Sequence, residues 1–228
     1  MSFLVAVYVN EGIVLASDRR STYTRTESIN GFTVQKIGIH VTNSTDKTFL
    51  CPNGAGISTC GDASLQGKPI TGFIQDMIHF KIKEETSVKE IPQIIIDYFS
   101  GFAVIPNVNF LVAGYATDED SIQNQKLYKV VLSSGRKTIE EIDTANQGAV
   151  WDGEVTTLSR ITQDVALLQN GSYVNFPHEE ILFTHFTLQD AVDFARFAVE
   201  TTINTMRFKN VIETVGGAVD ILVITPKE

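Results

Sequence analysis

The sequence is poor in cysteine and holds no long apolar run. Cys51 and Cys60 are its only cysteines and form no Cys-x-x-Cys pair, so neither a disulfide framework nor a zinc site is predicted. No segment approaches the roughly 18 consecutive apolar residues of a membrane-spanning helix, and the apolar start is too short and lacks the basic flank of a secretion signal. We therefore expect a cytoplasmic protein with no metal and no membrane partner.

Positive charge is also scarce. The 228 residues carry 18 Lys and Arg against 27 Asp and Glu, which gives a formal net charge of −9. This balance argues against a nucleic-acid backbone or an anionic membrane surface as a partner. The hydrophobic share of 43% and the charged share of 20% are those of a folded protein. The length fits one domain over residues 1–228.

Cofactor motifs are missing as well. The stretch Gly61-Asp62-Ala63-Ser64-Leu65-Gln66-Gly67-Lys68-Pro69 has one residue too many between its glycines for a phosphate-binding loop. Pro69 also stands where Ser or Thr should follow the lysine. No Gly-x-Ser-x-Gly nucleophile motif occurs. The sequence therefore predicts no cofactor.

The apolar patterns predict a mixture of strands and helices. Period-two and continuously apolar runs predict strands at 3–9, 13–17, 32–41, 48–51, 55–60, 108–115, 127–132, 138–143 and 218–224. Helical spacing predicts helices over 62–82, 88–102 and 153–163, and a last one that opens on the capping box Thr187-Leu188-Gln189-Asp190. This order lacks the strict strand–helix alternation of a parallel sheet, so a single mixed domain is expected.

The start of the chain is the most informative segment. Residues 3–9 are almost continuously apolar, which is typical of a strand buried on both faces, and Asn10-Glu11-Gly12 predicts a hairpin turn. If the hairpin is symmetric about Glu11, Leu4 lies opposite Asp18, and Ser2 then shares a face with Asp18. A different turn register would reverse the second strand and separate the two side chains.

Ser2 is the candidate nucleophile of this hairpin. Because a small residue follows Met1, we expect Met1 to be removed, which leaves Ser2 with a hydroxyl and a free α-amine. Such an amine can serve as the base that activates the hydroxyl, since its ordinary pKa of roughly 7.7–8.0 lies close to operating pH. Taken alone, the pattern fits a polar strand end with a solvated Asp18 somewhat better.

The same residues resemble the start of mature proteasome β-type subunits. Those proteins are N-terminal nucleophile hydrolases in which a terminal Thr is followed sixteen residues later by Asp. The segment Gly12-Ile13-Val14-Leu15-Ala16-Ser17-Asp18 is similar, and the spacing from Ser2 to Asp18 matches. Asp46-Lys47 before a strand, Gly61-Asp62 before a helix and Gly216-Gly217 before the last strand fit in order. The end of the chain is closest in look to the bacterial ancestral β-subunit type.

This resemblance implies both a fold and a site. The implied fold is of the α+β class, a four-layer αββα sandwich. The implied site has Ser2 as nucleophile, Asp18 and Lys47 as charged supports, and backbone N–H groups around Gly61 as oxyanion donors.

The chain also departs from the family pattern. Ser replaces Thr as the nucleophile, and the stretch between Asp18 and Lys47 is longer than usual. The acid and hydroxyl near the amine are displaced, with Asn210, Glu213 or Thr214 as candidates for their role. A Gly-Ser-Gly motif that supplies another hydroxyl is replaced around Gln147-Gly148-Ala149.

The activity implied is that of a proteasome-like N-terminal serine hydrolase that cleaves peptide or amide bonds without a cofactor. Its implied partners are peptide or protein substrates, further copies of itself in a ring or helical assembly packed through the helices at 62–82 and 88–102, and an unidentified ATPase. Two alternatives stay open. One is a connectase-like amide ligase or transpeptidase of similar fold, and the other is a non-catalytic ring or scaffold protein that keeps Met1.

Overall fold

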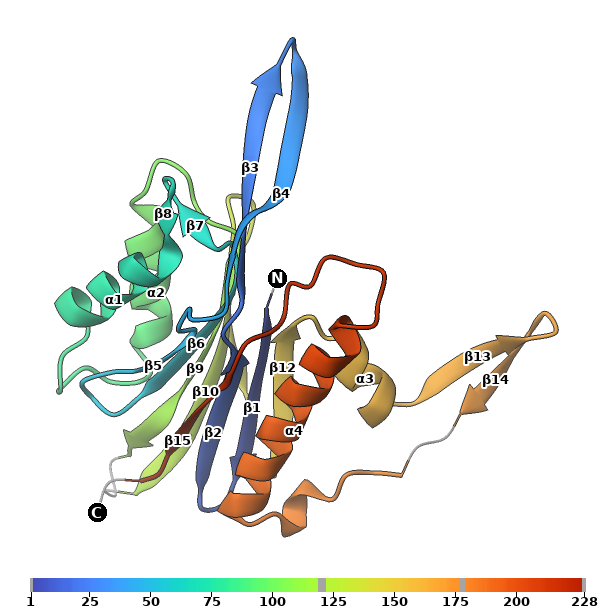
Figure 1. Cartoon of the computed structure of the whole chain (residues 1–228). Helices are drawn as coiled ribbons and strands as arrows, with labels where there is room; N and C mark the ends of the chain where they lie inside the picture. Colours follow the sequence, from blue (N-terminus) through green and yellow to red (C-terminus); the bar gives the residue numbers. More distant parts are fainter. Residues whose placement is uncertain (1, 119–121, 177–178, 227–228) are drawn as a thin grey trace.

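Two antiparallel sheets form the body of the protein, in a computed structural model that describes residues 2–118, 122–176 and 179–226 (Figure 1). The strand orders are β12-β1-β2-β15 and β11-β10-β9-β6-β5. Because β15 pairs with β2, strands from both ends of the chain meet in one sheet. The first sheet holds β1 (Phe3–Val9), β2 (Gly12–Asp18), β12 (Gly148–Gly153) and β15 (Val219–Ile224). The second holds β5 (Thr48–Leu50), β6 (Gly56–Gly61), β9 (Val108–Thr117), β10 (Gln123–Leu132) and β11 (Lys137–Ile142).

The strands β1 and β2 are buried along their whole length, which confirms the expectation of a first strand buried on both faces. Side chains of a strand point alternately to its two faces. Leu4 and Leu15 therefore pack in a cluster with residues of the second sheet. Val5 and Val14 pack on the opposite side in a cluster with residues of the last helix. The continuous apolar run of the sequence serves two separate cores.

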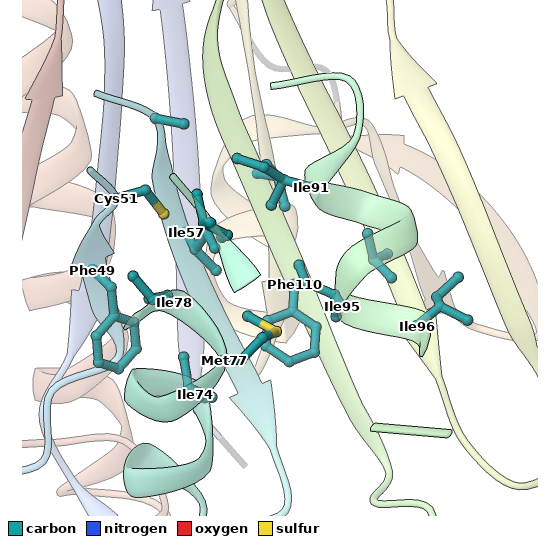
Figure 2. Close-up of a cluster of buried hydrophobic side chains, with 14 of the residues drawn as sticks. Phe49, Cys51, Ile57, Ile74, Met77, Ile78, Ile91, Ile95, Ile96 and Phe110 are labelled. Atoms are coloured by element: carbon teal, nitrogen blue, oxygen red, sulfur yellow. The ribbon is translucent and has the colours of Figure 1, made fainter. Parts of the chain in front are cut away.

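Helices pack on the outer faces of the two sheets. The helices α1 (Ile70–Lys81) and α2 (Ile91–Ser100) share an apolar cluster with the second sheet, and Figure 2 shows Met77 and Ile95 beside Phe110 of β9. The first sheet carries α4 (Leu188–Met206), which follows the short turn η1 (Phe183–His185), and α3 (Thr156–Thr162) contacts α4. The predicted capping box is confirmed, since the Thr187 side chain accepts from the N–H of Asp190 and the Asp190 carboxylate accepts from the N–H of Thr187.

Three helices are shorter than predicted, and the one expected over 88–102 spans only Ile91–Ser100. The helix expected from residue 62 begins at Ile70, because the preceding residues form the small ribbon of β7 (Ser64–Leu65) and β8 (Lys68–Pro69). The helix expected from residue 153 begins at Thr156, because Gly148–Gly153 is the strand β12, which the sequence analysis missed.

Two ribbons stand out from the body (Figure 1). The first pairs β3 (Ser21–Ile29) with β4 (Phe32–Thr42), and the second pairs β13 (Val165–Gln169) with β14 (Ser172–Phe176). The first ribbon accounts for the unusually long stretch between Asp18 and Lys47.

The hairpin register differs by one residue from the predicted one. Leu4 lies opposite Ser17 rather than Asp18, because two residues and not three connect the strands: β1 ends at Val9 and β2 begins at Gly12. The prediction that Ser2 and Asp18 share a face of this hairpin through cross-strand pairing is therefore wrong.

The α+β class is confirmed, but the finer expectation of a four-layer αββα sandwich needs correction. The strands among the described residues pair antiparallel, and three two-stranded ribbons and four α-helices accompany the two main sheets. No helix in the described part of the chain is both long and apolar enough to cross a membrane. The cytoplasmic location stays a prediction.

Candidate functional site

Ser2 lies buried immediately before β1, and the end of β12 holds its backbone. Its carbonyl oxygen accepts the N–H of Glu154 at 2.8 Å. The approach needs a glycine, because Gly153 has a φ of +88° and a Cβ there would lie 1.8 Å from the Ser2 oxygen. The sequence analysis placed the replaced Gly-Ser-Gly motif at Gln147-Gly148-Ala149, near the site. This placement is wrong, since Gly148 pairs with Tyr8 at the opposite end of β1 from Ser2. Met1 and its removal lie outside the described residues.

Asp18 is fully buried and organises the backbone around Ser2. Its Oδ1 accepts the N–H of Phe3 at 3.0 Å, and its Oδ2 accepts the N–H groups of Arg20 and Gly216, also at 3.0 Å. One carboxylate thus ties the start of β1 to the end of β2 and to the loop before β15. A buried carboxylate requires such donors, because an unpaired charge costs several kcal/mol in a protein interior.

Lys47 supplies the positive charge beside Asp18. It immediately precedes β5 and is buried, its Nζ lies 2.9 Å from Asp18 Oδ1, and the same Nζ donates to the carbonyl of Arg20. Burial lowers the pKa of Lys47, and the carboxylate of Asp18 opposes that effect. The Lys47 carbonyl accepts the N–H of Thr59 at 2.9 Å, which fixes the lysine against β6. The predicted supports therefore form one buried ion pair.

Three predicted residues line one small cleft of about 20 Å³, namely Ser2, Lys47 and Gly61. Gly61 ends β6 with a φ of +123°, and a Cβ there would lie 2.3 Å from the Asn107 oxygen, so only glycine fits. The next residue, Asp62, donates its N–H to that oxygen at 2.9 Å and accepts the N–H of Asn107 at 2.8 Å. The bend beside Ser2 is thus braced from both directions.

Cys60 lines the same cleft but is poorly suited to act as its nucleophile. Burial, with a further contribution from Asp152, raises the pKa of its thiol to about 12. Because the thiolate is the reactive form of cysteine, this side chain stays protonated and inert near neutral pH. The hydroxyl of Ser2 is the stronger candidate.

Thr214 does not line this cleft. It lines a neighbouring cavity of about 540 Å³, and its Oγ1 is buried without a hydrogen-bond partner among the described residues. Glu213, an alternative for the same role, pairs with the guanidinium of Arg20. Arg20 Nε also donates to Asn43 Oδ1 at 2.8 Å, so this arginine braces the loop that carries both candidates.

Sequence reasoning missed Glu154, which bonds the Ser2 backbone, and Thr22, which lines the same cleft as Ser2. Glu154 contributes a backbone group, so its side chain carried no signal; only Gly153 before it could have indicated a close approach. Thr22 lies at the base of a ribbon whose length the sequence did not define. Among the residues that the structure describes, no group of three or more His, Cys, Asp and Glu side chains is placed to hold a metal ion.

This arrangement of sheets and helices is a proteasome-like fold. Among solved structures, the chain resembles Anbu (ancestral beta-subunit) from Yersinia bercovieri with a TM-score of 0.54 and 15% identity, over 98% of this chain and 81% of that one. It also resembles an Anbu (Gly-1) mutant from Hyphomicrobium sp. strain MC1 with a TM-score of 0.58 and 13% identity, over 99% of this chain and 82% of that one. At such identities the likeness shows the fold alone. No family model matches the chain, and no curated protein matches its sequence.

These findings correct the family identification made from the sequence. The assignment to the proteasome β-type N-terminal nucleophile hydrolases is wrong, because the sequence matches no family model and the likeness to Anbu is weak in both identity and TM-score. In the described part of the chain, three two-stranded ribbons accompany the two main antiparallel sheets, so the structure is not the plain αββα sandwich of that family.

Proposed function

We propose that this protein is a serine hydrolase of proteasome-like fold that cleaves peptide or amide bonds with Ser2 as an N-terminal nucleophile. The observation that supports the proposal is one cleft lined by Ser2, Lys47 and Gly61, beside the buried Asp18–Lys47 pair. A nucleophile and a nearby cation are parts that acyl transfer requires. The expected oxyanion donors are backbone N–H groups near Gly61 other than that of Asp62, which is bonded to the Asn107 carbonyl.

The first step forms an ester on Ser2. Once Met1 is removed, the α-amine of Ser2 takes the hydroxyl proton while Oγ attacks the substrate carbonyl carbon. The positive charge of Lys47 favours a neutral amine and a deprotonated hydroxyl, and backbone N–H groups around Gly61 stabilise the oxyanion. The carbon–nitrogen bond then breaks, and the departing amine takes the proton from the α-ammonium group.

The second step restores the enzyme. Water attacks the ester carbonyl while the α-amine of Ser2 accepts its proton, and collapse releases a carboxylic acid and returns the proton to Ser2 Oγ. Both steps need a fixed nucleophile. The Ser2 backbone meets this need, because the N–H of Glu154 holds the Ser2 carbonyl and the carboxylate of Asp18 holds the N–H of Phe3.

The active form in this proposal is a homo-oligomer. The sequence predicted subunit contacts through the helices at 62–82 and 88–102, but the apolar faces of α1 and α2 are largely buried against the second sheet. Large exposed apolar side chains gather instead on the two ribbons, including Ile29, Phe32, Leu168, Tyr173 and Phe176.

The test uses protein released with Ser2 as its first residue and treated with a β-lactone, followed by intact mass measurement. We expect one adduct per chain, no adduct for Ser2→Ala and a retained adduct for Ser2→Thr, which keeps both the hydroxyl and the amine. A form that retains Met1 should not react, because a peptide nitrogen cannot accept the proton.

The matched control is Ser21→Ala, since Ser21 lines the same cleft and should be dispensable for labelling. Labelling of Ser2→Ala, or loss of labelling in Ser21→Ala with the fold intact, would show that the nucleophile is a different residue.

A further inference from the structure

A second cavity lies beside the proposed nucleophile. It has a volume of about 540 Å³ and is lined by residues from the base of the β3–β4 ribbon, the end of α4 and the loop after it. These three segments gather near the start of β1 in Figure 1. We call it the ribbon-base cavity. It is separate from the small cleft at Gly61, with which it shares one lining residue, Thr22.

The ribbon-base cavity adjoins the surroundings of Ser2. Thr22 lines both hollows, and Glu154, which lines the cavity, donates its N–H to the Ser2 carbonyl. The small cleft and the larger cavity therefore both lie next to Ser2.

The walls of the ribbon-base cavity are mainly apolar. Ile37 from β4, Met206 from the end of α4, and Val211 and Ile212 from the following loop line it. Of these, Ile37, Val211 and Ile212 are each about half exposed in the free protein. Covering such surface with an apolar side chain is favourable, because it removes apolar area from water.

Two threonines add polar groups to the wall. Thr22 and Thr214 line the cavity, and neither Oγ1 atom has a hydrogen-bond partner among the described residues. Both oxygens are covered by other atoms in the free protein, so a bound peptide reaches them only after a change of side-chain rotamer. The apolar side chains therefore determine what the cavity selects.

The two hollows differ in the size of side chain that they accept. The cleft at Gly61 has room for about one small group, whereas the ribbon-base cavity holds a whole apolar side chain. The carbonyl oxygen of the bond to be cleaved must lie near Gly61 to receive backbone donors. The two chains attached to a carbonyl carbon diverge, so a substrate whose acyl half lies on the Gly61 side of Ser2 has its amine half on the side of the ribbon-base cavity.

We infer that the ribbon-base cavity binds the substrate residue on the amine side of the scissile bond and selects a large apolar side chain there, an inference that rests on the proposed function of Ser2. When the ester forms on Ser2, the carbon–nitrogen bond breaks and this residue becomes the new N-terminus of the departing peptide. The proton held by the α-ammonium group of Ser2 moves to that nitrogen.

A pair of peptides with the same carbonyl half tests the selection. In both peptides Ala is the residue on the carbonyl side of the scissile bond. The residue on the amine side is Leu in one peptide and Gly in the other. We expect kcat/KM to favour Leu by at least about tenfold, since a well-filled apolar pocket discriminates by that order. Ile37→Asp should bring the ratio close to one. Ile39→Asp on the same strand is the matched control, because Ile37 and Ile39 are 52% and 53% exposed but only Ile37 lines the cavity.

A binding measurement separates this inference from the proposed chemistry. Leu-Ala-Ala-amide and Gly-Ala-Ala-amide, which represent the departing half, are titrated by calorimetry into Ser2→Ala protein. We expect the Leu peptide to bind about tenfold more tightly, with the preference lost on adding Ile37→Asp and kept on adding Ile39→Asp.

The outcomes distinguish the two claims. If Ser2 is never acylated but the Leu peptide binds with this dependence on Ile37, only the proposed chemistry fails. If Ser2 is acylated but neither assay shows a preference for Leu, or if Ile37→Asp and Ile39→Asp behave alike, the inference about the cavity is overturned.

Discussion

The ion pair between Asp18 and Lys47 stabilises the fold and also forms part of the candidate site. Asp18 receives three backbone N–H groups in addition to Lys47 Nζ, so the carboxylate is fixed before any substrate arrives. Lys47 is held in turn by Asp18 and by the carbonyl of Arg20. Breaking a buried pair by removing one partner typically costs about 3–5 kcal/mol. Lys47 is therefore a structural residue as well as a candidate source of charge for Ser2.

A prediction at the scale of single residues concerns Gly153, which lies against the Ser2 carbonyl oxygen. Gly153→Ala should lower stability and abolish β-lactone labelling, because the new Cβ would lie 1.8 Å from the Ser2 oxygen and force Ser2 to move. Gly171→Ala is the matched control: its φ is +79°, close to the +88° of Gly153, but nothing lies within 4 Å of the added Cβ. The control should cost only the backbone strain of about 1 kcal/mol or more and keep labelling. Equal effects of both variants on labelling would contradict the role of Gly153.

The buried thiols predict how stability depends on pH. Burial raises the pKa of Cys51 and of Cys60 from 9.0 to about 12, so the folded protein holds these protons more tightly than the unfolded chain. Their contribution to stability is fully present below pH 9 and is lost as pH rises from 9 to 12. Between pH 8 and pH 10 the loss should reach about 1.4 kcal/mol for each thiol.

Urea denaturation at the two pH values measures this effect. The comparison is between the wild type and the double variant Cys51→Ala, Cys60→Ala, because the other titrating groups, Lys47 among them, are common to both proteins. The decline in unfolding free energy should be steeper in the wild type. An equal decline in both would show that the thiols titrate in the folded state as they do in the unfolded chain.

At the scale of elements, the sequence predicted the strands and helices that are marked by a pattern within their own residues. The strands β1 and β2 were clear from their continuous apolar runs, and α4 from its capping box. The strand β12 was missed, because Gly148–Gly153 carries neither a continuous apolar run nor a regular alternation, and its last residue was assigned to a predicted helix. The register of the first hairpin was also wrong, since it depends on whether two or three residues form the turn, which Asn10-Glu11-Gly12 leaves undetermined.

The start of α4 gives a prediction at this scale. Thr187 and Asp190 form the capping box, and Glu11 Oε2 in the β1–β2 turn accepts the N–H of Leu188 at 2.6 Å. Thr187→Ala should lower the unfolding free energy by about 1 kcal/mol, because it leaves an N–H of the first turn without its acceptor. Thr187→Ser should restore it. Thermal unfolding followed by circular dichroism is the measurement, and an unchanged Tm for Thr187→Ala would contradict the cap's contribution.

At the scale of the whole molecule, the site is assembled from segments far apart in the sequence. Ser2, Asp18, Lys47 and Gly61 were named from the sequence through a family resemblance, and the structure places three of them around one cleft with Asp18 against Lys47. The approach of Glu154 to Ser2 and of Gly216 to Asp18 could not be predicted. Backbone contacts of this kind do not depend on the side chains of the residues involved, so the sequence shows them only where a glycine is needed nearby. The roles of all these residues in catalysis stay predictions.

The two ribbons pose the main question about assembly. A two-stranded hairpin alone is marginally stable in water, and both ribbons extend from the body with unpaired edges and exposed apolar side chains (Figure 1). Phe32 is 75% exposed near the tip of the first ribbon, and Tyr173 is 77% exposed near the tip of the second. Exposed apolar groups concentrated in this way are typical of protein interfaces. A homo-oligomer that packs through its ribbons would cover them.

Native mass spectrometry at micromolar concentration tests this assembly. We expect an oligomer in the wild type, and smaller species for Phe32→Asp and for Tyr173→Asp, because a charge in an apolar interface without a partner is costly. Phe80→Asp is the control, since Phe80 is 64% exposed but lies on α1, and its assembly should match the wild type. If only Phe80→Asp dissociates the oligomer, the subunits contact one another through the helices, as the sequence analysis predicted. A wild-type monomer would remove the proposal.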